Sequence, residues 1–160
     1  MPFTIDNSTA PVHELPDDAI FNFSCSKAQK PRDYLFSSED EYERALADYI
    51  PDLREVERIV RHESQHRGVA IAIGVEVVHY ALRTNELGQI VWVYTNNQGG
   101  KTPKIGLAAM LAAPTDPSKS DIADIKALGY KGVGDVGRRV MAWNKQKQGM
   151  FIPVPLSFKG

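Results

Sequence analysis

The residues best suited to chemistry lie in the segment His62-Glu63-Ser64-Gln65-His66, which matches the pattern H-E-x-x-H. In a helix, a spacing of four residues places both imidazoles on one face, where they can share one zinc ion. The glutamate between them can then serve as general base toward a water molecule on the ion. The motif therefore predicts a zinc-dependent hydrolase with His62 and His66 as metal ligands and Glu63 as the catalytic residue.

A third zinc ligand has to come from outside this motif. The longer pattern H-E-x-x-H-x-x-G-x-x-H is absent, because Val69 and Ala72 stand where it has glycine and histidine. His79 is the expected third ligand, since it is the only other histidine nearby and a neutral imidazole suits zinc. Glu76 and Glu86 are the alternatives.

The same motif also has a purely structural interpretation. Arg61 and Arg67 flank it, and Gly68 is expected to end the helix directly after it. On that interpretation the motif is a solvated, charged helix end with ordinary surface ion pairs. The residues that would form those pairs are Arg58, His62, Glu63 and His66.

A second candidate site lies near the C-terminus. The turn Gly132-Val133-Gly134 joins two expected helices and resembles a helix–hairpin–helix element, in which glycine N–H groups and a helix N-terminus bind a nucleic-acid phosphate. The expected contact residues are Lys131, Gly132, Gly134, Arg138 and Arg139. Against this, Asp135 opens the second helix and would repel phosphate, so a glycine turn between two packed helices is the alternative.

Length and composition set the class of protein. A chain of 160 residues with 42% hydrophobic and 24% charged residues is long enough for one folded domain. The single Cys25 excludes an internal disulfide and any Cys-rich zinc site. Neither a secretory signal nor a long apolar span is visible, so we expect a soluble, intracellular protein or part of a particle, with no membrane partner.

Charge is distributed unevenly along the chain. Residues 1–66 hold 14 acidic and 7 basic side chains, whereas residues 67–160 hold 6 acidic and 12 basic ones. This polarity is typical of a protein with an anionic partner, or of one whose halves face each other within a fold or between copies.

The elements that must position these residues are predicted from caps and hydrophobic periodicity. Helices are expected from Glu39 to about Tyr49 and from Pro51 or Asp52 to Arg67, followed by an antiparallel hairpin. The hairpin strands begin with the alternating residues 69–77 and continue, after a turn at 84–89, with residues 90–95. Three short helices follow, at 104–113, from Ser118 or Ser120 to Leu128, and at 135–147.

These elements predict an α+β fold in a single domain, with helices flanking a central hairpin or small sheet. The globular domain is expected at 33–148, between a proline-containing extended arm at 1–32 and an extended C-terminal segment at 149–160. From the arms and the charge polarity, we expect a non-enzymatic interaction or assembly subunit that binds other protein chains. A zinc-dependent H-E-x-x-H hydrolase is the alternative, and nucleic-acid backbone binding is the second alternative.

Overall fold

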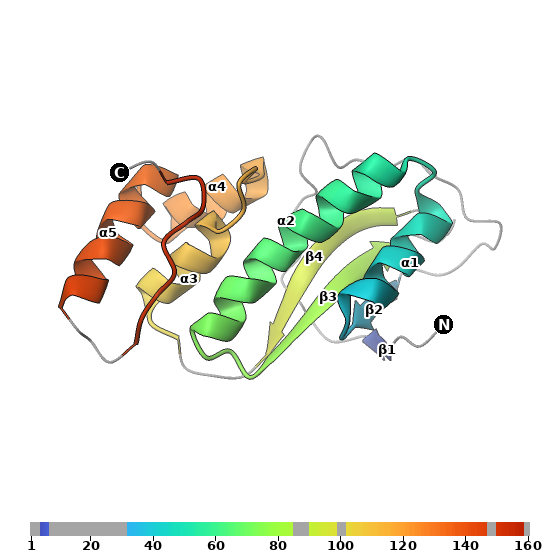
Figure 1. The fold of residues 1–160 in the computed structure, drawn as a ribbon, viewed down its shortest axis with the longest axis horizontal. Helices are drawn as coiled ribbons and strands as arrows, with labels where there is room; N and C mark the ends of the chain where they lie inside the picture. Colours follow the sequence, from blue (N-terminus) through green and yellow to red (C-terminus); the bar gives the residue numbers. More distant parts are fainter. Residues whose placement is uncertain (1–3, 7–31, 85–89, 99–101, 147–149, 159–160) are drawn as a thin grey trace. The chain divides into compact units, whose positions relative to one another are not determined.

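The computed structural model describes residues 4–6, 32–84, 90–98, 102–146 and 150–158. Most of the predicted N-terminal arm, including Cys25, lies outside the described residues. The fold is α+β, as the sequence predicts (Figure 1). The described elements are β1 (Thr4–Asp6), β2 (Arg32–Phe36), α1 (Glu39–Tyr49), α2 (Leu53–Ala72), β3 (Val77–Thr84), β4 (Ile90–Gln98), α3 (Lys104–Ala112), α4 (Lys119–Ala127) and α5 (Val133–Lys145).

The chain divides into two compact units. The first unit consists of Met1–Ser64 and His79–Asn96, and the second consists of Gln65–Val78 and Asn97–Gly160. Helix α2 runs without interruption from one to the other, because the division falls between Ser64 and Gln65.

The first unit is a sheet covered by helices. Its strands follow the order β1-β2-β3-β4, with β2 antiparallel to both β1 and β3. Tyr34 lies opposite Leu82 in the β2–β3 register, so both side chains are on the same face of the sheet. That face packs against α1 and the first half of α2. The core residues are Tyr34, Phe36, Tyr42, Ala45, Leu46, Ile50, Val56, Ile59, Val60, Tyr80, Leu82 and Val93.

Local signals explain how α1 is placed on this sheet. Ser38 caps the helix by accepting a hydrogen bond from the Glu41 N–H at 3.2 Å, as the serine-acid start predicts. The fully buried Tyr42 then donates its hydroxyl hydrogen to the Ala81 carbonyl of β3 at 3.0 Å. This hydrogen bond fixes α1 to the sheet and gives the buried Tyr42 hydroxyl a partner.

The second unit is helical. Its core consists of the last turns of α2, the small residues of α3, and one face each of α4 and α5, with Ile125, Val136 and Val140 fully buried. The C-terminal segment packs on the same unit. Trp143 Nε1 donates to the Met150 carbonyl at 3.0 Å, and the Asn144 amide bonds both backbone groups of Ile152 at 2.8 and 2.9 Å.

The strand predicted at residues 69–77 is wrong. Helix α2 continues to Ala72, and β3 begins only at Val77. The helix ends at Gly74, whose φ of +90° suits glycine. There the Gly74 N–H bonds the Ile71 carbonyl at 3.1 Å and the Val75 N–H bonds the Ala70 carbonyl at 3.0 Å. This is the Schellman pattern of a helix end, so Gly68 lies inside the helix.

Candidate metal centre

The H-E-x-x-H motif lies in the middle of α2 and is buried. Only 4% of His62, 4% of Glu63 and 7% of His66 is exposed. The interpretation of the motif as a solvated helix end is therefore wrong, because it assumed that the helix stops at Gly68. Polar side chains of this kind are rarely buried unless they are paired or bind an ion.

The burial has a simple geometric origin. The buried positions of α2 recur every three or four residues and form one stripe along the helix. Apolar residues occupy the stripe at both ends, and the three polar residues replace them in the middle. The members of this buried stripe are Val56, Ile59, Val60, His62, Glu63, His66, Val69 and Ala70, and the buried Ile73 follows directly after the helix.

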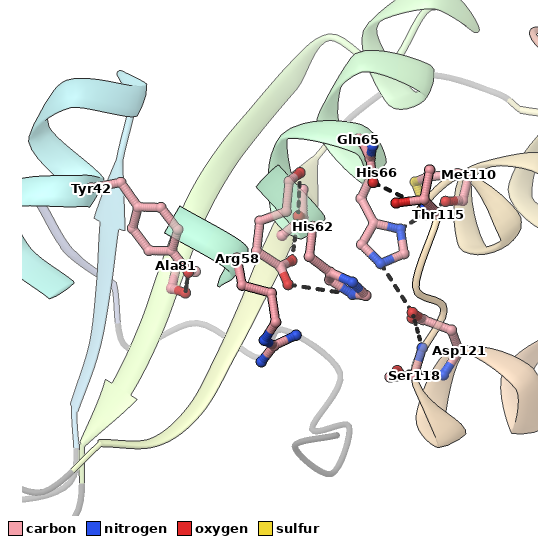
Figure 2. A network of polar contacts seen from close by, with 12 residues as sticks. Tyr42, Arg58, His62, Gln65, His66, Ala81, Met110, Thr115, Ser118 and Asp121 are labelled. Carbon is pink, nitrogen blue, oxygen red and sulfur yellow. Dashed lines mark hydrogen bonds and ion pairs between the residues drawn. The ribbon is translucent and has the colours of Figure 1, made fainter. Parts of the chain in front are cut away.

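His66 is held at both ring nitrogens (Figure 2). Its Nδ1 lies 2.7 Å from the Met110 carbonyl oxygen, and its Nε2 lies 3.3 Å from Asp121 Oδ2. Because a carbonyl only accepts, Nδ1 must carry a hydrogen. In the neutral ring Nε2 is then a bare acceptor facing a carboxylate, an arrangement that needs a proton or a metal ion between the two atoms. A backbone carbonyl on Nδ1 is also the usual outer partner of a metal-binding histidine.

Asp121 is positioned by the start of α4. Ser118 caps this helix by accepting from the Asp121 N–H at 3.0 Å, and Asp121 Oδ2 accepts in return from the Ser118 N–H at 3.0 Å. The two residues form a capping box, which fixes the carboxylate. The same oxygen faces His66, and Asp121 is only 8% exposed.

These residues form a group able to hold a metal ion. His62 precedes His66 by one turn of the same helix, so α2 itself sets the spacing of the two rings. In the part of the chain that the structure describes, one ligand atom each from His62, His66 and Asp121 lies within 4.8 Å of the others. Two imidazoles and one carboxylate are ligands that zinc accepts.

Glu63 is fixed beside this group. One carboxylate oxygen accepts the Thr95 hydroxyl hydrogen of β4 at 2.8 Å, and the other lies 3.8 Å from His62 Nε2. The following residue, Ser64, has its hydroxyl 2.9 Å from the Tyr80 hydroxyl. The first unit thus anchors this turn of α2 at two successive residues.

The group of His62, His66 and Asp121 does not include the predicted third ligand, His79, whose role as a ligand stays a prediction. His79 lies on β3. Its Nδ1 is buried without a hydrogen-bond partner among the described residues. Sequence reasoning missed Asp121, which follows His66 by 55 positions. The only local signal, Ser118 three residues before an acid, predicts a helix start and says nothing about a metal.

The second candidate site lies at the start of α5. Gly132 is its N-cap, with an extended backbone, and Gly134, Arg138 and Arg139 follow within the helix. The Asp135 carboxylate accepts the Lys131 N–H at 2.9 Å and lies 3.5 Å from Arg139 Nε. That backbone hydrogen bond, helped by Arg139 and Arg138, holds the pKa of Asp135 below its ordinary value. A carboxylate therefore lies at the start of α5, beside the glycine turn at which the sequence interpretation expects a phosphate.

No family model matches this sequence, and neither a curated protein nor a solved structure is significantly similar to it. Among the helices of the described residues, none combines the length and the apolar character needed to cross a membrane.

Proposed function

We propose that this protein binds a zinc ion through His62, His66 and Asp121 and uses it to catalyse hydrolysis. The observation behind this proposal is the convergence of three buried ligand atoms within 4.8 Å. The proposal keeps the predicted ligands His62 and His66 and replaces His79 by Asp121.

The donor set favours a catalytic over a structural zinc site. Structural sites use four protein ligands, whereas catalytic sites use three, often two histidines and a carboxylate, and leave one position open. Zinc with an open position activates water near neutral pH and polarises the oxygen of a bound substrate. The outer contacts suit this role, because Met110 orients His66 and Ser118 orients Asp121.

Glu63 is the candidate base. Thr95 donates to one of its oxygens and so fixes the carboxylate, while the other oxygen faces His62. A carboxylate held next to a metal ligand is placed to accept a proton from the attacking water. The same residues without such a base would bind a metal but would not promote hydrolysis by this route.

Metal analysis and a hydrolysis screen test the two parts of the proposal. Untagged protein is loaded with zinc, freed of excess, and measured by elemental analysis for all first-row transition metals. We expect about one zinc per chain in the wild type and much less in the His66→Ala variant. Glu63→Gln should keep its zinc and lose hydrolysis of whichever ester, peptide or phosphoester the wild type cleaves.

The possible results separate clearly. A wild type that retains no metal contradicts the whole proposal. A zinc-loaded wild type whose Glu63→Gln variant is equally active contradicts the role of Glu63 but leaves the metal site intact. Stoichiometric iron in place of zinc would contradict the hydrolase and favour oxidative chemistry, for which two histidines and one carboxylate are also typical ligands.

A further inference from the structure

The outward face of α5 is basic. Arg138, Met141, Ala142 and Lys145 are exposed and recur at i, i+3, i+4 and i+7, so they lie along one side of the helix. Arg139 is exposed beside them. The opposite side is buried in the second unit through Val136, Gly137 and Val140. Packing therefore fixes which face of α5 points to solvent.

The positive charge of this face is largely uncompensated. Between Lys131 and Gln146 the sequence contains four cations and one acid, Asp135. Among the described residues, the ion pair of Arg139 with Asp135 at 3.5 Å is the only one that involves these four cations. The lowered pKa of Asp135 keeps it charged, so the segment has a net charge of +3 at neutral pH.

The chemistry of the face selects among anionic partners. A helix that binds a membrane surface needs large apolar side chains beside its cations, and a protein interface needs an apolar or aromatic anchor. Met141, at 41% exposed, is the only exposed large hydrophobic residue of α5. Cations without an apolar anchor are sufficient for a phosphate backbone, which is bound through charge and hydrogen bonds.

We propose that the outward face of α5, with Lys131 just before the helix, binds the phosphate backbone of nucleic acid through the side chains of Lys131, Arg138, Arg139 and Lys145. Arg138 and Lys145 are seven residues apart, or roughly 10 Å along the helix, which is the axial rise of about three nucleotides of one strand. The contact surface is the side of the helix, including Lys145, and not the glycine N–H groups at its start. This inference does not rest on the metal site.

Salt-dependent binding of a fluorescently labelled DNA duplex of about 20 base pairs, and of the matching single strand, tests the proposal. The variant is Arg138→Gln/Lys145→Gln, in which both residues are exposed and glutamine retains helix propensity. The control is Arg54→Gln/Arg61→Gln, which removes two exposed cations from α2. Circular dichroism is used to check that each variant is folded. The nucleic-acid titrations are repeated in the presence of a metal chelator and with the His66→Ala variant.

For the wild type we expect affinity for at least one nucleic acid that falls as salt rises from about 50 to 200 mM. The α5 double variant should lower the slope of log affinity against log salt by about 2, while the α2 control leaves it unchanged. No binding by the wild type, or equal slopes for both double variants, would overturn the proposal. Binding to anionic phospholipid vesicles but to neither nucleic acid, with a loss of vesicle affinity in the α5 double variant, would also overturn the proposal. Loss of binding with chelator or with His66→Ala would contradict the independence from the metal site.

Discussion

The orientation of His66 is decided by one backbone atom. Because the Met110 carbonyl occupies Nδ1, the other nitrogen is directed at Asp121. Asp121 in turn uses the same oxygen for the Ser118 N–H and for His66. An ion bound here would therefore be linked through Asp121 to the start of α4, so metal binding and the docking of that helix should stabilise each other.

Asp135 gives a residue-level prediction about pH. The Lys131 N–H and the two arginines favour its charged form, so a carboxyl titration by NMR should show a midpoint below the ordinary aspartate value. Because the folded pKa is lowered, its contribution to stability is complete above the unfolded pKa and is lost as pH falls through the folded one. Arg139→Gln should raise the midpoint. A midpoint at or above the ordinary value would show that these contacts do not persist in solution.

Two glycines of α5 give a matched pair of predictions. A Cβ at Gly137 would overlap the ring of Phe158, whereas one at Gly134 would meet only the end of Arg138 at 3.5 Å. We expect Gly137→Ala to destabilise the protein by about 1–3 kcal/mol in urea unfolding. Gly134→Ala should be neutral or stabilising, since alanine favours helix. Adding Phe158→Ala should recover most of the loss, and a Gly137→Ala variant as stable as the wild type would contradict the packing of the C-terminal segment.

At the level of elements, caps were predictable and the end of α2 was not. Ser38 and Ser118 are local signals, and the helices that they start appear where the sequence predicts them. Residues 69–77 alternate between large β-branched and smaller or charged side chains like a strand, yet α2 continues through Ala72, with Val69 and Ala70 buried and Ile71 51% exposed. Two glycines, at 68 and 74, each look like a helix end, and only tertiary packing decides between them.

Substitution of these two glycines tests the corrected helix. Gly68 lies inside α2 with open space beside it, so Gly68→Ala should stabilise the protein by about 1 kcal/mol. Gly74 has a φ of +90°, so Gly74→Ala should destabilise it by about 1–2 kcal/mol. Urea unfolding measures both. If Gly68→Ala destabilised the protein and Gly74→Ala stabilised it, the helix would end at Gly68, as the sequence alone suggests.

At the level of the whole molecule, α2 serves two cores. Val56, Ile59 and Val60 belong to the core of the first unit, and Val69, Ala70 and Ile73 belong to that of the second. Along the sequence, the motif His62–His66 lies between these two sets of apolar core residues. A sequence pattern identifies His62, Glu63 and His66 because they are neighbours, but it cannot find Asp121, which only the fold of the second unit brings to His66. The predicted role as an assembly subunit stays a prediction.

The choice between Asp121 and His79 as third ligand is the most direct test of the metal centre. Zinc affinity is measured by competition with a chromogenic chelator for the wild type, Asp121→Asn, His79→Ala and Ser118→Ala. We expect Asp121→Asn to weaken zinc binding by at least about tenfold, and His79→Ala to leave it unchanged. Ser118→Ala removes the cap but no ligand, so it controls for damage to α4 and should retain the ion. Undiminished zinc binding by Asp121→Asn, with loss in His79→Ala, would contradict the proposed centre.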